Sequence, residues 1–403
     1  MIDFELSDSQ KNIREMVRWF AREEVRPLAL ESDKAHTVPL EFLKKSMQLG
    51  LGSGTRPKAL GGDGEGAGEE RDAKGTKQGN RVSIILGEEI AWGDPAVVLT
   101  FPGPGLGGPP VQFTGTAEQK SRAFGIFKND GVPRWGAYAL TEPAAGSDVA
   151  GIQATARKDG NHYILNGRKC YITNGARATW NVVFATVDKS QGRAGHRAFL
   201  VFKGTPGFSV GKIEDKLGLR ASETAELVFE DCKVHVDDLL GGEEHYDKGA
   251  KGGFTTAMKT FDSTRPMVAA MAVGIARAAY DVVHDHIREN YLLSRPIARY
   301  HVLAELIANM ERKIAAARLM CWRAAWMADE GIPNSKEASM SKAYAAQVAS
   351  WVCQEAIGLM GHLGTYHANL VEKLYRDVKV YDIFEGTGQV QRIVISRRLL
   401  KGL

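Results

Sequence analysis

One carboxylate in the sequence stands in a setting that suits a general base. Residues 381–389 read YDIFEGTGQ, so Glu385 lies between an apolar run and a flexible Gly-Thr-Gly segment. Apolar surroundings disfavour the ionised form of a carboxyl group and raise its pKa, which favours proton transfer near neutral pH. Glu385 is therefore a candidate catalytic base, although most single glutamates in such segments have no catalytic role.

Two earlier stretches carry groups that could hold a polar or flat ligand. Residues 138–151 read YALTEPAAGSDVAG and combine hydroxyl groups with small residues whose backbone N–H groups could face a phosphate. Residues 171–175 read YITNG, an aromatic ring and a hydroxyl beside a turn, which suits a flat heterocycle. Taken alone, a plain loop and the end of a hairpin explain these two stretches equally well.

Three other kinds of motif are weak or absent. Gly103, Gly105 and Gly108 match the dinucleotide pattern G-x-G-x-x-G, but Pro109 and Pro110 follow, and no strand–helix–strand unit surrounds the match. A glycine-rich connection between helices is the better interpretation. The ten histidines show no convincing metal-ligand spacing, so we expect no metal, and without a G-x-S-x-G elbow nothing supports a serine hydrolase.

The bulk composition excludes other classes of protein. The chain has 403 residues, with 52 basic and 48 acidic side chains and a formal net charge of +4, which does not favour nucleic-acid binding. Four scattered cysteines without a C-x-x-C pair are typical of a reduced intracellular compartment. The first residues do not resemble a signal peptide, and the longest uncharged apolar run, 267–276, is too short to span a membrane. We expect a cytoplasmic protein with no membrane span.

The first third of the chain, residues 1–133, is predicted to be a helical domain. Ser7 and Gln10 form a capping-box signature, and apolar residues then recur at helical spacing. Helical patterns return at 82–90 and 117–128. Residues 61–80 are rich in Gly and charged residues, which predicts a surface insertion.

Residues 134–240 are predicted to form a β-domain, an antiparallel barrel or sandwich. Turn dipeptides at 159–160, 166–167 and 174–175 are the clearest breaks. Short runs of strand-forming residues lie at 135–140, 152–157, 163–166, 182–187, 198–202 and 225–229.

Residues 250–403 are predicted to be a four-helix bundle. One expected helix, 304–328, places Leu306, Met310, Ile314 and Ala317 on a single face. Pro266, Pro296 and Pro333 are expected to separate the long helices. The predicted fold is therefore α+β with three domains, and these domains must position the candidate residues.

Taken in order, the motifs resemble the acyl-CoA dehydrogenase family over nearly the whole chain. The matching stretches, in sequence order, are YALTEPAAGSD from residue 138, YITNG from 171, FDSTRP from 261, VEKLYRD from 371 and FEGTGQVQR from 384. The resemblance implies that family's fold, which agrees with the three predicted domains, and FAD as the cofactor. It also implies a set of residues around the cofactor: Tyr138, Leu140, Thr141, Ser147, Tyr171, Ile172, Thr173, Thr387 and Gln389.

The resemblance implies a reaction as well. Glu385 would take the α-proton of an acyl-CoA thioester while a hydride leaves the β-carbon for the flavin, giving the trans-2-enoyl-CoA. The thioester oxygen would accept a hydrogen bond from the backbone N–H of Glu385. Substrate contacts are implied for Ser147, Asp262, Arg265 and Gly386, and electrons would pass to electron-transferring flavoprotein.

The sequence departs from the family where neighbouring subunits share FAD. The family's R-x-x-F-G motif aligns with residues 290–294, where Asn290 replaces the arginine, and its Q-x-x-G-G stretch aligns with 358–362. We expect a homotetramer or homodimer with a looser cofactor site. A heterotetramer whose partner supplies the arginine is the alternative, and a non-catalytic partner subunit is a second, although an idle subunit would not need Glu385.

Overall fold

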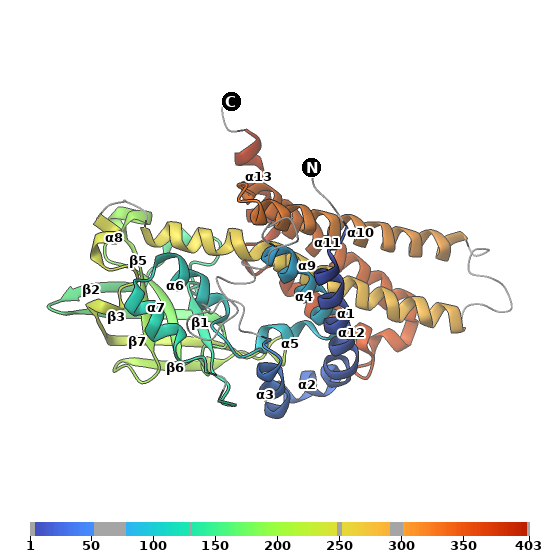
Figure 1. The fold of residues 1–403 in the computed structure, drawn as a ribbon, viewed down its shortest axis with the longest axis horizontal. Helices are drawn as coiled ribbons and strands as arrows, with labels where there is room; N and C mark the ends of the chain where they lie inside the picture. Colours follow the sequence, from blue (N-terminus) through green and yellow to red (C-terminus); the bar gives the residue numbers. More distant parts are fainter. Residues whose placement is uncertain (1–4, 52–77, 129, 248–251, 291–300, 401–403) are drawn as a thin grey trace.

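The computed structural model describes residues 5–51, 78–128, 130–247, 252–290 and 301–400. A curled sheet forms one end of the molecule and helices form the other (Figure 1). The helix α9, Gly252–Asn290, begins beside the sheet and runs through the helical part, so it joins the two ends.

The N-terminal part is helical, as predicted. Ser7 caps the first helix, and the reciprocal bonds with Gln10 complete the predicted capping box, at 3.2 Å for Gln10 N to Ser7 Oγ and 3.1 Å for Ser7 N to Gln10 Oε1. The helices are α1 Asp8–Phe20, α2 Ala29–Ala35, α3 Leu40–Gln48, α4 Gly79–Gly93, α5 Pro95–Thr100, α6 Gly108–Thr114 and α7 Ala117–Phe124.

The predicted insertion ends earlier than expected. Residues 79 and 80 belong to α4, whereas residues 61–77 of the predicted insertion lie outside the described residues. The start of α4 is fixed because Asp329 accepts hydrogen bonds from Asn80 N at 2.8 Å and from Arg81 Nε at 2.8 Å. A sequence window of Gly and charged residues does not reveal such a distant partner.

The middle part is a seven-stranded sheet with the order β1-β4-β2-β3-β7-β6, and β5 pairs with β4. Most pairings are antiparallel, as predicted, but β1 and β2 both run parallel to β4, so the sheet is mixed. The strand β6 was not predicted; its side chains are largely exposed and show no apolar alternation. The strands are β1 Gly136–Ala139, β2 Thr155–Asp159, β3 His162–Thr173, β4 Trp180–Thr186, β5 His196–Phe202, β6 Phe208–Ile213 and β7 Thr224–His235.

One predicted turn is a bulge inside a strand. Asn166 and Gly167 lie within β3, and the register against β7 shifts between Leu165 and Gly167. Gly167 has φ +144°, and a Cβ there would lie 2.7 Å from the Cβ of Ala154. Glycine is therefore required by close backbone approach inside the sheet, not by a chain reversal.

The C-terminal part is helical, as predicted, although its boundaries differ. Pro266 lies inside α9 rather than ending a helix. Met310, Ile314 and Ala317 of α10 are buried on one face, as expected. The region of the predicted fourth long helix holds two shorter ones, α12 and α13, separated by a turn that carries Glu385. The remaining helices are α8 Glu243–Asp247, α10 His301–Asp329, α11 Ser335–Met360, α12 Leu370–Val378 and α13 Gly388–Leu399.

The helix α9 is long and apolar enough to cross a membrane by length and composition, with a mean hydropathy of 1.4 in its most apolar window. However, 72% of that window is buried inside the protein, as in the core helix of a folded domain. Close packing accounts for this burial, because a Cβ on Gly274 would lie 2.3 Å from the carbonyl oxygen of Glu88 on α4.

A buried ion pair joins the three parts. The Lys373 ammonium lies 2.7 Å from Asp94 Oδ2 and 2.5 Å from Asp377 Oδ2, and all three side chains are fully buried. Asp94 also caps α5, and Asp377 Oδ1 accepts a bond from the N–H of Leu219 in the segment between β6 and β7. One ammonium therefore fixes the N-terminal helices, the sheet and α12 against one another.

We predict that Lys373→Met lowers the free energy of unfolding by about 3–5 kcal/mol, because two buried carboxylates lose their counter-charge. Chemical denaturation followed by circular dichroism measures the change. The control is Lys11→Met, which removes an exposed pair with Asp8 and should cost less than about 0.5 kcal/mol. Equal, small effects of the two substitutions would contradict the role assigned to Lys373.

Candidate active site

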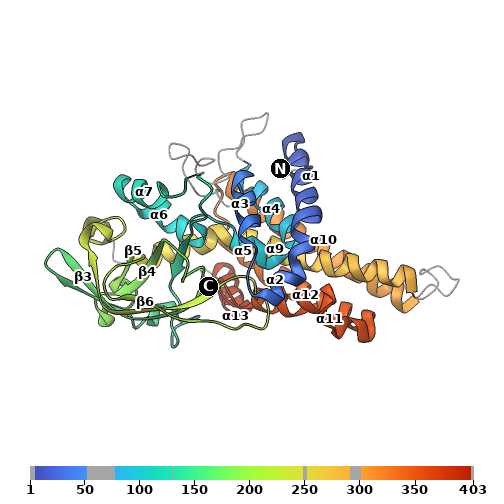
Figure 2. The same ribbon diagram turned by 90° about the horizontal axis from the view of Figure 1, so that it is seen from below.

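Glu385 lies in the turn between a 3-10 segment, Lys379–Asp382, and α13. This turn lies at the boundary between the sheet and the helical part (Figure 2). Glu385 has φ +53° and Gly386 has φ +95°, so two consecutive residues occupy the left-handed region. A non-glycine residue in this region costs on the order of 1–3 kcal/mol, and such strain persists only where surrounding contacts hold it.

The Glu385 carboxyl group lies among buried groups of α9 and α11. Burial raises its pKa, and a hydrogen bond from Thr264 together with the charges of Arg265 and Lys342 partly offsets this rise. Thr264 Oγ1 donates to Glu385 Oε2 at 2.7 Å. Within the part of the chain that the structure describes, the backbone N–H of Glu385 has no hydrogen-bond acceptor.

Three side chains hold the carbonyl groups of the turn. Gln391 Nε2 donates to the carbonyls of Glu385 and Gly386, at 3.2 Å and 2.9 Å. Lys342 Nζ donates to the Gly386 carbonyl at 2.7 Å, and Arg265 Nε lies 3.4 Å from the Glu385 carbonyl. These bonds leave the Glu385 N–H and carboxylate available to a ligand. The turn can therefore accept a proton and donate a hydrogen bond to an oxygen that gains negative charge.

Arg265 and Asp262 lie beside this turn on α9. Arg265 is 4% exposed, and its Nη1 donates to Asp262 Oδ1 at 2.7 Å. Ser335 Oγ donates to the same Asp262 oxygen at 3.2 Å. The predicted substrate contacts of Asp262 and Arg265 remain predictions, whereas their support of the Glu385 turn is visible in these bonds.

Tyr138 brings the sheet to the same place. Its ring packs against Phe261 of α9, with centroids 5.7 Å apart, and burial together with the Glu385 charge raises its pKa. Its hydroxyl is buried and makes no hydrogen bond with any described residue. A buried, unpaired hydroxyl beside a carboxylate suits a polar ligand group placed between the sheet and the helices.

A second buried ion pair holds the loop after β1. Lys169 Nζ donates to Glu142 Oε1 at 2.6 Å and to the Leu140 carbonyl at 3.0 Å, and burial lowers the pKa of Lys169 to about 8. The N–H of Cys170 donates to the Thr141 carbonyl at 2.9 Å. The two stretches that the sequence offered as ligand-binding, YALT and YIT, therefore lie side by side.

The predicted cofactor residues divide into two groups. Tyr171 is 66% exposed with φ +58°, and the hydroxyls of Thr141 and Thr173 make no hydrogen bond within the described residues. These groups are open to a ligand. The other predicted residues have fewer groups open to a ligand. Leu140 and Ile172 have buried side chains, and Thr387 uses its hydroxyl to cap α13. Ser147 is exposed in the loop after β1, and Gln389 is exposed in the first turn of α13.

Three residues at the turn were missed in the sequence: Thr264, Lys342 and Gln391. Thr264 could have been found, because it lies within the FDSTRP stretch between Asp262 and Arg265. A lysine inside the small and apolar stretch at 338–349 is a weaker signal, and burial of Lys342 is visible only in the structure. Gln391 is fully buried and lies within the FEGTGQVQR stretch, but nothing in its residue type indicates that it holds the turn.

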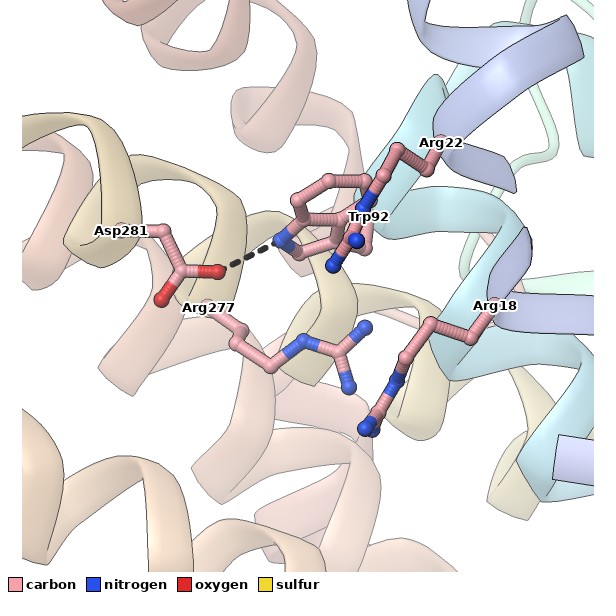
Figure 3. A pocket seen from close by; sticks show the side chains of 5 residues that line it. All are labelled: Arg18, Arg22, Trp92, Arg277 and Asp281. Carbon is pink, nitrogen blue, oxygen red and sulfur yellow. Dashed lines mark hydrogen bonds between the residues drawn. The ribbon is translucent and has the colours of Figure 1, made fainter. Parts of the chain in front are cut away.

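A cavity of about 220 Å³ lies elsewhere, between α1, α4 and α9 (Figure 3). Its guanidinium groups are largely paired: Arg18 and Arg277 both bind Glu89, and Trp92 Nε1 donates to Asp281 Oδ2 at 2.7 Å. It contains none of the residues around Glu385. The lining residues are Arg18, Arg22, Trp92, Arg277 and Asp281.

The comparisons with known proteins show the family of the chain. Sequence models of the acyl-CoA dehydrogenase N-terminal, middle and C-terminal domains match residues 7–125, 137–232 and 251–400. The chain is 38% identical to acryloyl-CoA reductase (NADH) of Anaerotignum propionicum over 99% of this chain and 96% of that protein. It is 37% identical to the short-chain specific acyl-CoA dehydrogenase of Clostridium acetobutylicum over 99% of this chain and 100% of that protein.

The fold has a close structural relative too. A chain in a structure described as electron transferring flavoprotein of Acidaminococcus fermentans superposes with a TM-score of 0.87 at 38% identity, covering 99% of this chain and all of that one. The site and fold define an oxidoreductase that acts on a CH–CH bond. The chain belongs to the acyl-CoA dehydrogenase family, whose cofactor is FAD.

The residues present fit FAD. An exposed aromatic ring at Tyr171, unpaired hydroxyls at Thr141 and Thr173, and the buried unpaired hydroxyl of Tyr138 offer one flat surface and several polar contacts. Among the described residues, no group of three His, Cys, Asp or Glu side chains could hold a metal ion.

We predict that Thr264→Val moves the acidic limb of the pH–rate profile for flavin reduction to higher pH. The hydroxyl stabilises the ionised form of Glu385, so its loss raises that pKa further, and the base is lost at a higher pH as the solution is acidified. On the acidic limb the rate should fall about tenfold, with little change at the plateau. Ser263→Ala is the control, because the Ser263 hydroxyl donates to the Thr260 carbonyl of its own helix at 2.7 Å and not to Glu385. An unmoved limb in Thr264→Val would contradict the assignment.

Proposed function

We propose that the chain oxidises an acyl-CoA thioester to the trans-2-enoyl-CoA, with Glu385 as the α-proton base. The observation that carries the proposal concerns two groups of one residue. Burial raises the pKa of the Glu385 carboxyl group, and the backbone N–H of Glu385 has no acceptor among the described residues. The thioester oxygen accepts this N–H bond, and the developing enolate is stabilised there while the carboxylate takes the proton. Ser147, Asp262, Arg265 and Gly386 complete the proposed substrate contacts.

The proposed cofactor contacts come from the sheet and from the turn. Tyr138 in β1 and Leu140, Thr141 and Ser147 in the loop after it would hold the FAD from one side. Tyr171, Ile172 and Thr173 would hold it from the end of β3, and Thr387 and Gln389 from the start of α13. FAD, when bound, accepts the hydride from the substrate β-carbon. Tyr138 is buried and Glu385 is partly buried, which limits the access of water to the place where proton and hydride leave.

The proposed electron acceptor is electron-transferring flavoprotein, which the structural relative from Acidaminococcus fermentans supports. The similarity to acryloyl-CoA reductase (NADH) favours a second direction, reduction of an enoyl-CoA. The same residues serve both directions, because Glu385 would then return the proton to the α-carbon. Two rates separate the directions: reduction of the oxidised flavin by an acyl-CoA, and reoxidation of the chemically reduced flavin by the enoyl-CoA. If reoxidation is the faster of the two, the protein is a reductase.

The assembly and location are proposals as well. We take residues 1–133, 134–240 and 250–403 as the three domains and expect a cytoplasmic homotetramer or homodimer. Asn290 is exposed at the end of α9, and its side-chain amide donates to the His286 carbonyl at 2.9 Å. Residues 291–294 of the aligned motif lie outside the described residues, and a heterotetramer stays the alternative.

We predict that the purified protein carries FAD and is bleached anaerobically by a short-chain acyl-CoA. Glu385→Gln should keep the FAD but slow bleaching by about three orders of magnitude or more, because an amide cannot take the α-proton. Stopped-flow absorbance measures both properties. Protein that binds no FAD would overturn the proposed function, whereas Glu385→Gln with a wild-type rate would place the base elsewhere.

We predict that Asn290→Arg tightens FAD binding by about 1–3 kcal/mol in a homo-oligomer, because a guanidinium can bind the pyrophosphate of a neighbour's FAD. Flavin release in mild chaotrope measures the change. The control is Asn161→Arg, which adds the same charge on the exposed hairpin between β2 and β3. One FAD per two chains, together with a co-purifying homologue, would indicate the heterotetramer. One FAD per chain with no effect of Asn290→Arg on FAD release would mean that the residue at position 290 does not affect FAD binding.

A further inference from the structure

Lys342 approaches the Glu385 turn from α11. It is 1% exposed, and its ammonium donates to the Gly386 carbonyl at 2.7 Å. A lysine is rarely fully buried unless it is paired. The acceptor here is a backbone carbonyl rather than a carboxylate, so the burial of this charge is not accounted for by a simple ion pair.

The charged groups around Lys342 come from three elements. They are Arg265 on α9, Asp382 at the end of the 3-10 segment before the turn, and Glu385 itself. Burial lowers the pKa of Lys342 to about 8, and the charges of Asp382 and Glu385 partly offset this effect, whereas Arg265 adds to it. The ammonium form therefore predominates at neutral pH, so a positive charge faces the candidate base.

The turn depends on donors to its carbonyl groups. Gly386 has φ +95°, and a Cβ there would lie 2.5 Å from Gln391 Nε2, so Gln391 already fills one side of the turn. Lys342 reaches the same carbonyl from α11. Among the described residues, it is the one cation that donates to Gly386, and its charge reaches Glu385 through space as well.

We propose that Lys342 is a positioning residue for the base. It fixes the left-handed Glu385–Gly386 turn through the Gly386 carbonyl, and its positive charge keeps Glu385 ionised until the substrate α-proton is available. In the step itself the α-C–H bond breaks, its proton moves to the Glu385 carboxylate, and Lys342 keeps its own proton. The inference rests on the proposed function, because it assigns a role within that reaction.

The sign of the expected effect follows from the charge. A cation near a carboxylate favours the ionised form, so removing the cation raises the pKa of Glu385. The acidic limb of the rate of flavin reduction should then move to higher pH. A residue needed only for folding would lower the rate or the yield at every pH without moving this limb.

The experiment compares Lys342→Met, Lys342→Gln and Lys342→Arg as FAD-loaded proteins. At acidic pH, the flavin of Lys342→Met and Lys342→Gln should be reduced about tenfold more slowly than that of the wild type, because the acidic limb of the pH–rate profile is displaced to higher pH. Lys342→Arg should keep the wild-type pH–rate profile. A second measurement uses an acyl-CoA analogue with sulfur at the β-position, which can lose its α-proton but cannot give up a hydride. Its deprotonation, followed by absorbance, should show the same displacement.

Lys216→Met is the matched control, because Lys216 also donates to a backbone carbonyl, that of Ser222 at 2.7 Å, in the segment between β6 and β7. Lys216→Met should leave the acidic limb of the pH–rate profile at its wild-type position. A wild-type limb in both Lys342→Met and Lys342→Gln would overturn the proposal, and so would failure of both variants to fold with FAD bound, since the lysine would then serve the fold. Wild-type protein that acyl-CoA does not bleach would instead contradict the proposed function.

Discussion

The ammonium of Lys373 is the interaction on which the rest of the structure depends. It lies between two buried carboxylates that would otherwise repel each other more strongly, those of Asp94 and Asp377. Asp94 fixes the start of α5 in the N-terminal part, and Asp377 accepts a hydrogen bond from the N–H of Leu219 in the segment between β6 and β7. Since α12 continues through a short 3-10 segment to Glu385, the same ion pair sets the position of the base relative to the strands.

The chemistry at Glu385 follows from opposing electrostatic effects. Burial raises the pKa of the carboxyl group, and the Thr264 hydroxyl, Arg265 and Lys342 lower it, but burial is the larger effect. If the hydrogen bond and the two positive charges fully offset the effect of burial, the carboxylate would be a weak base. If nothing offset the effect of burial, the carboxyl group would be harder to ionise. The compensation observed here is partial, so the pKa of Glu385 stays above its ordinary value and the carboxylate is a stronger base than an exposed glutamate.

The local features of the fold could be predicted from the sequence, and the distant ones could not. The capping box at Ser7 and the apolar face of α10 depend on neighbours in the chain. The parallel pairing of β1 with β4 depends on a partner about 44 residues away, counted from Gly136 to Trp180, and no turn signal encodes it. Lys342 was missed for the same reason, because its acceptor is Gly386, 44 residues further along the chain.

The described part of the chain has six non-glycine residues with positive φ, and two of them, Leu219 and Glu385, lie near Asp377 in space or in the chain. Tyr171, Leu219 and Glu385 are non-glycine residues with positive φ, at +58°, +49° and +53°. The Asp377 carboxylate accepts a hydrogen bond from Leu219, and Glu385 follows Asp377 in the chain after one short 3-10 segment. The position of Asp377 therefore constrains both residues. Glycine would relieve the strain at 385 but would remove the carboxylate. The conformation is therefore retained because the side chain and the free N–H must point to the same place, and the contacts from α9, α11 and α13 offset its cost.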